Sequence, residues 1–287
     1  MKLAYSTNAY TRTDLDSALK SIAGLGFAAA EILCDRPHWF PGEVSDEQLK
    51  QTGKQLQELN LKVSNLNINT ANGYYDPQPV ENVFEPSLTN RDSELRAWRE
   101  HYTIKGIKLA HHLDAPISLT SGRPVPGTPP EEALDYFVDS LKRICTVAAE
   151  YGVKVGIEYE PDLLVESAVE TITIIERVGS PLLGVNFDIG HSRVFGEEID
   201  ETVNLLAGRI WNVHVEDIKG RKHFHLIPGL GDLPFAKYIN ALRKVNYDGY
   251  LTVELYSYPE QPQEAGRQAL EYLTPLITNL PDAHSHP

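Results

Sequence analysis

Short apolar runs alternate with longer amphipathic segments along the whole chain. A buried parallel strand appears as a near-continuous apolar run, whereas an amphipathic helix repeats its apolar residues every three or four positions. The apolar runs predict strands at Leu3–Thr7, Ala29–Cys34, Lys62–Asn67, Pro116–Thr120, Lys154–Tyr159, Leu183–Asp188, Ile210–His214 and Tyr250–Glu254. The amphipathic segments predict helices at Asp14–Leu25, Asp46–Leu59, Arg91–Leu113, Pro130–Tyr151, Ser167–Val178, Glu198–Leu206, Pro234–Lys244 and Glu264–Leu280.

Residues typical of helix ends support several of these boundaries. Ser45 precedes an acidic first turn, and Pro130 occupies a first-turn position, where a helix tolerates proline. Gly152 and Gly179 follow the last periodic residues of their helices, where glycine commonly adopts the left-handed cap conformation. These residues therefore predict where the helices around them begin or end.

The alternation of strand and helix continues without a break or a polar linker. Eight such units predict an α/β fold, the (β/α)8 TIM barrel, as one domain over residues 1–281 with a disordered tail at 282–287. An open doubly wound sheet is the alternative, but the glycine fingerprint that usually follows its first strand is absent from residues 7–13. The sequence therefore favours the closed barrel.

Two connections are longer than the loops that usually join a strand to a helix. They are Asn69–Asn90 and Ser121–Pro129, and both follow predicted strands. Both should therefore lie at the C-terminal rim of the barrel, where the active sites of this fold are found. There they could form a substrate lid or an oligomer contact, and the sequence does not separate the two.

Four of the predicted strands end in an acidic residue or a histidine, namely Glu158, Asp188, His214 and Glu254. The ends of parallel strands meet at one rim, so these side chains should converge. A buried carboxylate is costly unless it is paired or bound to a metal. Carboxylate oxygens and imidazole nitrogens are ligands of divalent cations, so the four residues predict a site for one such cation.

Further candidates lie in the segment after the seventh predicted strand. His223 and His225 form an H-x-H pair, and in an extended backbone both imidazoles would lie on one side, where they could bind a transition metal. Lys219 and Arg221 could bind a phosphate near the rim. A solvated polar loop explains all four residues equally well.

Two more candidates for substrate contact lie near the ends of earlier strands. Trp39 follows the second predicted strand and could form a wall against a sugar or cap the barrel rim. Asn67 ends the third predicted strand, so its amide should lie at the same rim.

The formal net charge of −14 repels polyanions, which argues against nucleic acid or an anionic membrane as a partner. The two cysteines, Cys34 and Cys145, have no metal-like spacing and are expected to be reduced structural residues. No signal sequence and no apolar segment of membrane-spanning length is evident. We therefore expect a soluble cytoplasmic protein, either a monomer or a homo-oligomer.

The second half of the sequence resembles the xylose-isomerase-like barrel superfamily, which spans sugar isomerases and epimerases, inosose and dehydroshikimate dehydratases, and endonuclease IV. The resemblance implies that Glu158, Asp188, His214 and Glu254 hold one divalent metal, with Mn, Mg, Co or Zn as the candidates. It also implies that Glu158 and Glu254 transfer protons on either face of the carbon next to the substrate carbonyl. Asp188 and His191 form a D-x-x-H similar to the motif of the family at that strand.

One detail is similar to the endonuclease branch, in which a D-x-H precedes a glycine-x-glycine turn and contributes to a further zinc site. Here His223 and His225 precede Gly229 and Gly231, so a second metal site made of His191, His223 and His225 is implied. The third and fourth predicted strands end without the histidines of the first endonuclease site. A complete trinuclear phosphodiesterase centre is therefore not expected.

These observations predict a metal-dependent isomerase or epimerase of a small carbohydrate, with or without a phosphate. Glu158 and Glu254 would transfer the proton, and His191 would hydrogen-bond a substrate oxygen and stabilise the enediolate charge. A metal-dependent dehydratase of the inosose or dehydroshikimate type is the alternative, because it begins with the same proton abstraction. An endonuclease IV-like phosphodiesterase and a non-catalytic sugar-binding barrel are weaker alternatives.

Overall fold

Eight parallel strands close into a barrel in the computed structural model, which describes residues 1–79 and 83–278. In barrel order they are β1 (Lys2–Ser6), β10 (Tyr250–Val253), β7 (Ile210–Val215), β6 (Leu183–Asp188), β5 (Val155–Ile157), β4 (Ile117–Leu119), β3 (Lys62–Asn67) and β2 (Ala29–Leu33). All eight predicted strands are confirmed, with boundaries that shift by a residue or two. The (β/α)8 fold predicted from the sequence is therefore correct.

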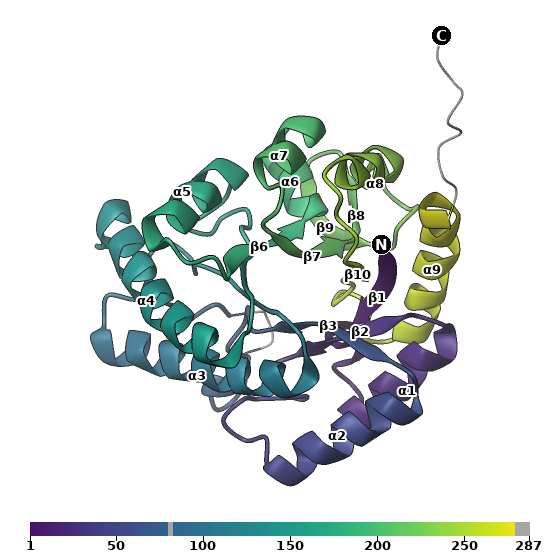
Figure 1. Cartoon of the computed structure of the whole chain (residues 1–287), viewed down its shortest axis with the longest axis horizontal. Coiled ribbons are helices and arrows are strands. Elements are labelled where there is room, and N and C mark those ends of the chain that lie inside the picture. The colour runs from purple at the N-terminus through teal and green to yellow at the C-terminus, as the bar shows by residue number, and fades with distance from the viewer. Residues whose placement is uncertain (80–82, 279–287) are drawn as a thin grey trace.

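Helices surround the barrel as an outer ring, as the view down the barrel in Figure 1 shows. The predicted ones are α1 (Leu15–Leu25), α2 (Asp46–Glu58), α3 (Ser93–Leu113), α4 (Pro130–Tyr151), α5 (Ala168–Val178), α7 (Ile199–Leu205), α8 (Phe235–Lys244) and α9 (Pro262–Thr278). Ser45 forms a capping box with Gln48 at the start of α2. Gly152 and Gly179 end α4 and α5 with φ values of 67° and 73°. The helix-end residues therefore act as predicted.

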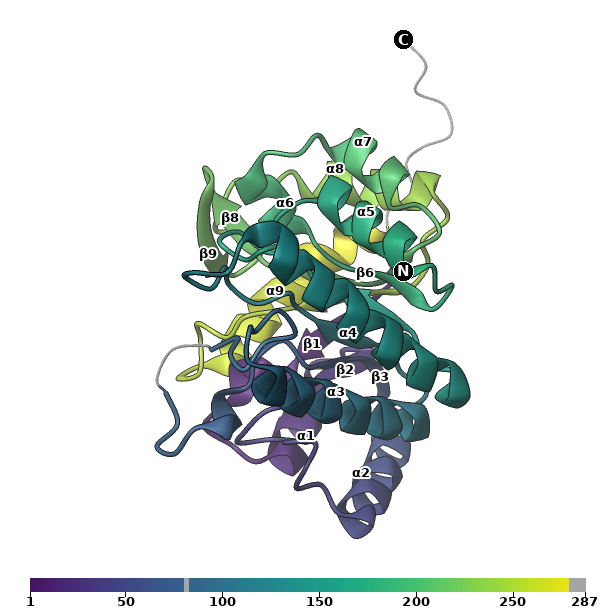
Figure 2. The same ribbon diagram turned by 90° about the vertical axis from the view of Figure 1, so that its left-hand side faces the viewer.

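Several shorter elements were not predicted. They are the 3-10 turns η1 (Thr7–Tyr10) and η2 (Asn72–Tyr74), the helix α6 (Ile189–Phe195), and a hairpin of β8 (Asp217–Lys219) and β9 (Lys222–Leu226). Figure 2 shows this hairpin at the edge of the molecule in side view. The hairpin strands are short and rich in charged residues, so no apolar alternation marks them. The segment is therefore a hairpin and not an irregular loop, although Lys219 and Arg221 are exposed, as the solvated alternative expected.

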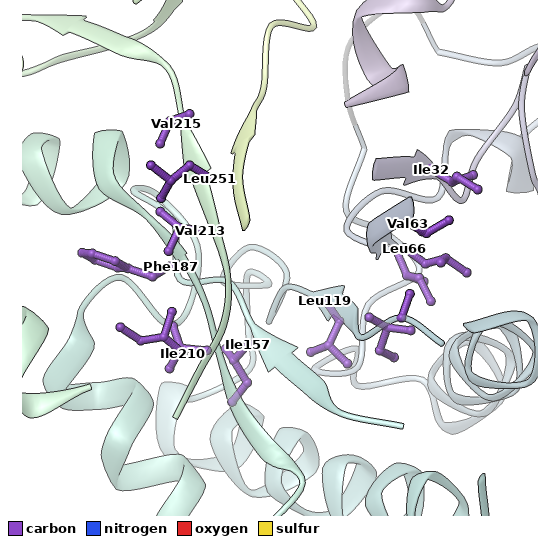
Figure 3. Packing of buried hydrophobic residues seen from close by; sticks show 14 of the residues in the cluster. Ile32, Val63, Leu66, Leu119, Ile157, Phe187, Ile210, Val213, Val215 and Leu251 are labelled. Atoms are coloured by element: carbon purple, nitrogen blue, oxygen red, sulfur yellow. The ribbon is translucent and has the colours of Figure 1, made fainter. Parts of the chain in front are cut away.

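The strands present apolar side chains to the helices and polar side chains to the barrel interior. Figure 3 shows Val213 and Val215 of β7 together with Phe187 of β6 in the apolar layer. The alternate residue of β7, Asn212, instead donates a hydrogen bond to Asn186 Oδ1 of β6, at 2.8 Å. Because side chains alternate along a strand, this inward face carries the polar residues up to the C-terminal rim.

Three other predictions can be compared with the fold. Cys34 and Cys145 are buried and form no disulfide, as expected. Within the described residues, no helix combines the length and apolarity needed to cross a membrane. The predicted disordered tail, 282–287, lies outside the described residues.

Candidate metal centre and its cavity

Side chains from four neighbouring strands of the barrel converge at its C-terminal rim. They belong to Glu158 after β5, Asp188 at the end of β6, His214 in β7 and Glu254 after β10. One ligand-type atom from each residue lies within 4.8 Å of those from the other three, and all four residues are buried. The structure therefore brings together the complete set that the sequence predicted, at spacings that a single cation could bridge.

His214 lies at the centre of this group. Its Nδ1 atom is 3.2 Å from Glu158 Oε1 and 3.6 Å from Glu254 Oε2, while its Nε2 atom is 2.6 Å from Glu31 Oε2. A carboxylate that accepts from one imidazole nitrogen fixes the tautomer and leaves the other nitrogen to bind a metal. Glu31 therefore orients His214. Glu31 was not predicted as a site residue, although a glutamate inside the apolar strand Ala29–Leu33 was a visible signal.

Replacing Glu31 with Gln is expected to weaken the binding of a divalent cation about 10–100-fold, because the orientation and basicity of His214 depend on this carboxylate. Competition with a fluorescent chelator would measure the change. Glu100→Gln is a matched control, because Glu100 lies on α3 and pairs with Arg143 outside the cavity. Equal metal affinity in Glu31→Gln and wild-type protein would show that Glu31 has no such role.

Side-chain amides hold the outer oxygens of both glutamates. Glu158 Oε2 accepts from Asn69 Nδ2 at 2.9 Å and from Asn186 Nδ2, and Glu254 Oε1 accepts from Asn8 Nδ2 at 2.9 Å and from Asn67 Nδ2 at 3.2 Å. The other oxygen of each glutamate faces His214. Each carboxylate is therefore fixed with one oxygen directed toward the shared centre.

Asp188 has two different roles at its two oxygens. It is the N-cap of α6, and its Oδ1 atom accepts from the backbone N–H groups of Gly190 at 2.8 Å and His191 at 2.9 Å. Its Oδ2 atom is buried and has no hydrogen-bond partner among the described residues. A buried carboxylate oxygen without a partner is costly, so the donor set fits a bound cation.

The electrostatics of the group favour positive charge. Burial raises the pKa of Glu254; His214 opposes this shift, and the negative charges of Glu158 and Glu31 add to it. Burial alone would lower the pKa of His214, but the charges of Glu158, Glu31 and Glu254 raise it well above the usual range. The site therefore holds protons where a divalent cation could replace them.

A second group of possible ligands lies beside the first and contains His191, His223 and His225. The Nε2 atom of His223 is 3.0 Å from that of His191 and 3.1 Å from that of His225. The Nδ1 atoms of His191 and His225 face the carbonyl oxygens of Tyr159 and Glu254, at 3.0 and 3.1 Å. A carbonyl can only accept, so both Nδ1 atoms donate and both Nε2 atoms present lone pairs.

These imidazoles are neutral at physiological pH. Burial, followed by the charge of His223, lowers the pKa of His191 to about 3. Burial also lowers the pKa of His225 to about 3, although the negative charge of Asp188 opposes this shift. Burial also lowers the pKa of His223. Neutral imidazoles with converging lone pairs are typical of zinc ligands. The structure therefore brings together the three histidines that the sequence suggested.

Glu216 was not predicted as a site residue. It is fully buried just after β7, its carboxylate oxygens accept no hydrogen bond from a described donor, and its side chain lies within hydrogen-bonding reach of Asp188. Burial, followed by the charge of Asp188, raises its pKa well above the usual range. It lies within metal-binding reach of His225 and Glu254. A Cβ at position 190 would lie 1.6 Å from Glu216 Oε1, so a larger residue there would displace the Glu216 side chain.

A cavity of about 640 Å³ opens over these groups. Its described lining includes Glu158, Glu254, His191, His223 and His225. Both long connections that the sequence placed at the rim also contribute, through residues such as Asn72, Phe84 and Arg123. Their position at the C-terminal rim is therefore confirmed, and the cavity has the volume of a small-molecule site.

Of the four residues predicted to contact the substrate, only one is in the described lining of the cavity. Asn67 is in the described lining of the cavity, whereas Trp39, Lys219 and Arg221 are not. Trp39 is only 4% exposed and packs in the apolar core. Lys219 is exposed on the hairpin, and Arg221 donates to the carbonyl oxygens of Val194 and Phe195 at the end of α6. The hairpin cations therefore do not form a phosphate site in this cavity.

Comparison with known proteins places the chain among enzymes of sugar chemistry. A family model described as a xylose isomerase-like TIM barrel matches residues 19–276. Fructoselysine 3-epimerase of Shigella flexneri is 25% identical over 283 residues, which cover 96% of this chain and 98% of that protein. Inosose dehydratase of Mesomycoplasma hyopneumoniae is 28% identical over 167 residues, which cover 51% of this chain and 56% of that protein.

Solved structures share the fold over nearly the whole chain. A D-tagatose 3-epimerase-like protein superposes with a TM-score of 0.79 at 22% identity, covering 96% of this chain and 98% of that one. The IOLI protein, solved with a bound zinc atom, has a TM-score of 0.78 at 20% identity, covering 97% of this chain and 98% of that one.

Proposed function

The chain belongs to the xylose isomerase-like TIM barrel family, and we propose that it is a metal-dependent epimerase that inverts the carbon next to the carbonyl of a small ketose. The observation that carries this proposal is the convergence of Glu158, Asp188, His214 and Glu254, of which the two glutamates line the cavity. The fructoselysine 3-epimerase relative, similar over almost its whole length, supports the reaction type.

The four residues would hold the cation through Glu158 Oε1, Asp188 Oδ2, His214 Nδ1 and Glu254 Oε2. A divalent cation, when bound, supplies Lewis-acid polarisation of a substrate carbonyl, which acidifies the neighbouring C–H group. The protein holds these side chains rigidly. Glu31 fixes His214, side-chain amides fix the two glutamates, and backbone N–H groups at the start of α6 fix Asp188.

Two glutamates on opposite sides of the centre suit a reaction that inverts a carbon. Glu158 follows β5 and Glu254 follows β10, and the strands β6 and β7 lie between them in the barrel. One carboxylate takes the proton from one face of the substrate carbon, and the other returns a proton to the opposite face. Both glutamates line the cavity, so both can reach a bound substrate.

His191 is assigned a different role from the one that the sequence suggested. Its Nδ1–H donates to Tyr159 O, and its low pKa keeps the ring neutral, so Nε2 carries no proton. This nitrogen therefore cannot donate a hydrogen bond to an enediolate oxygen. It can bind a cation or accept from a substrate hydroxyl.

A dehydratase is the second candidate, because the inosose dehydratase relatives match about half of the chain. A dehydratase begins with the same proton abstraction and then expels a hydroxyl group from the next carbon. The two reactions differ in their products: the epimer keeps all the atoms of the substrate, whereas dehydration loses water.

Incubation of the metal-loaded protein with ketoses in D2O tests the proposal. An epimerase yields the epimer with one deuterium at the inverted carbon, which NMR and mass spectrometry would detect. A dehydrated product would instead support the second candidate. Ketose binding without deuterium incorporation or product would indicate a non-catalytic sugar-binding barrel and would contradict the proposal.

We also propose that His191, His223 and His225 bind a second cation through their Nε2 atoms. His223→Ala is then expected to lower the metal content from two equivalents to one, because it removes one of three converging imidazole nitrogens. Elemental analysis with anomalous diffraction at the metal edge would count and place the ions. Lys222→Ala, in the same strand, is the control. A single ion in fully loaded wild-type protein would rule out the second site.

A further inference from the structure

The cavity extends beyond the two groups of ligands to a part that is lined by arginine side chains. Among its described lining residues, Arg36 and Arg123 are the arginines. Arg36 is already paired with Glu43, through two hydrogen bonds, and its guanidinium lies 5.1 Å from the centre of the Phe40 ring. Arg36 is therefore occupied, and Arg123 is the cation that can serve a ligand.

Arg123 has the surroundings of a binding residue. It lies in the long connection between β4 and α4, it is exposed to the cavity, and it makes no ion pair or hydrogen bond with another described residue. Its guanidinium is 5.8 Å from the centre of the ring of Phe84, another lining residue. A planar guanidinium beside an aromatic ring presents its donors in a fork that matches a carboxylate.

We infer that Arg123 binds a carboxylate of the substrate, and that the substrate is a ketose carrying an amino acid. This inference rests on the proposed epimerase function and names its substrate class. A phosphate fits the cavity less well, because it carries about two negative charges and is usually bound by several donors. Glu158 also lines this cavity, and its negative charge repels a dianion more strongly than a carboxylate.

Glu160 provides the complementary group for an amino acid. Its side chain lines the cavity and has no hydrogen-bond partner among the described residues, and the charge of Arg123 acts on it without a direct ion pair. It lies two residues beyond Glu158, so it points to the same side and further up the rim. An α-amino acid has a carboxylate and an ammonium group on one carbon. Arg123 would bind the carboxylate, and Glu160 would accept from the ammonium.

Three synthetic ligands separate these two contacts. They are the fructose derivatives of lysine, of cadaverine, which lacks the α-carboxylate, and of 6-aminohexanoate, which lacks the α-ammonium. Calorimetry with the metal-loaded protein would measure Kd for each. Arg123→Met is expected to weaken the lysine and aminohexanoate derivatives about 10–100-fold, the usual effect of losing a charged hydrogen bond, and to leave the cadaverine derivative unchanged.

Glu160→Gln is expected to show the converse pattern, weakening the lysine and cadaverine derivatives but not the aminohexanoate derivative. Lys142→Met is the control, because Lys142 is an exposed cation on α4 outside the described lining of the cavity. If Arg123→Met weakened all three ligands equally, or none of them, Arg123 would not be a carboxylate site. Either result would overturn the inference.

Steady-state kinetics distinguish a failure of this inference from a failure of the proposed function. If the lysine derivative is epimerised, Arg123→Met is expected to raise KM with little change in kcat, because Arg123 binds a group remote from the reacting carbon. Epimerisation that is indifferent to Arg123 would overturn the substrate class and leave the function intact. Ligand-selective binding without any epimerisation would support the carboxylate site and overturn the function.

Discussion

Replacing Glu254 with Gln is expected to lower the rate of epimerisation by about 10²–10⁴-fold, the usual contribution of a positioned general acid or base. The amide of Gln keeps the shape of the side chain but cannot take up the proton. Glu158→Gln is expected to have an effect of similar size, because the reaction needs one carboxylate on each face of the substrate carbon. Both glutamates line the cavity and face the same imidazole.

The two variants should differ in the proton that they still exchange. Glu254→Gln retains Glu158, so it should exchange deuterium into the epimer whose hydrogen faces Glu158, without inverting it. Glu158→Gln should exchange only the other epimer. NMR of each separate epimer in D2O, at saturating metal, would measure both rates. Glu100→Gln, on α3 outside the described lining, is the control. Full epimerisation by either glutamine variant would contradict the two-base assignment.

The ligands of the first site could be predicted because each one ends an apolar run. The run itself marks a buried strand, and the polar residue at its end has no reason to be there unless it is paired. This signal is strong for Glu158 and Glu254, which interrupt sequences of apolar residues just before a turn. The order of strands in the barrel then brings the ends together without further information.

The residues that hold those ligands in place could not be predicted. Glu31 lies in the middle of a strand, and its contact with His214 depends on how β2 and β7 face one another across the barrel interior. Asn69 and Asn186 donate to one oxygen of Glu158 from different strands and loops. A sequence reports which face of a strand a residue occupies, but not its partner across the barrel.

For loop residues too, the sequence does not show which way a side chain points. Trp39 follows a strand and was a reasonable candidate for a sugar wall, but its backbone N–H donates to Leu33 O at 3.2 Å and its ring is buried in the core. Arg123 lies in a connection that the sequence identified as part of the rim, yet only the structure shows that it faces the cavity. Position along the chain therefore predicted the location of a loop, but not the direction of its side chains.

Removing the cation is expected to abolish epimerisation and to make the folded protein less stable as the pH rises above about 6.5. The groups responsible are Glu254, Glu216 and His214, whose pKa values are raised in the folded protein. In the unfolded chain the carboxyl groups titrate near 4.5 and the imidazole near 6.5. Above pH 6.5 the unfolded chain has released protons that the folded, metal-free protein still holds. Stability therefore falls with rising pH, by about 1.4 kcal/mol per pH unit for each such proton.

His191 and His225 act in the opposite sense, but in a lower range of pH. Their pKa values are about 3 in the folded protein against 6.5 for the unfolded chain, so the stability that they contribute is lost as the pH falls from 6.5 toward 3. Above pH 6.5 these two histidines are neutral in both states. The loss of stability above pH 6.5 is therefore caused by Glu254, Glu216 and His214, and not by these two histidines.

Calorimetric melting of the chelator-treated protein between pH 6.5 and 8.5 would measure this decline. A bound divalent cation takes the place of the protons, so Mn or Zn should raise the melting temperature most at high pH and should release protons on binding. Titrations in two buffers of different ionisation enthalpy would count those protons. Glu254→Gln removes one proton-holding group, so its metal-free decline should be shallower than that of the wild type. Parallel pH profiles with and without metal would mean that the buried carboxylates and His214 do not form the cation site.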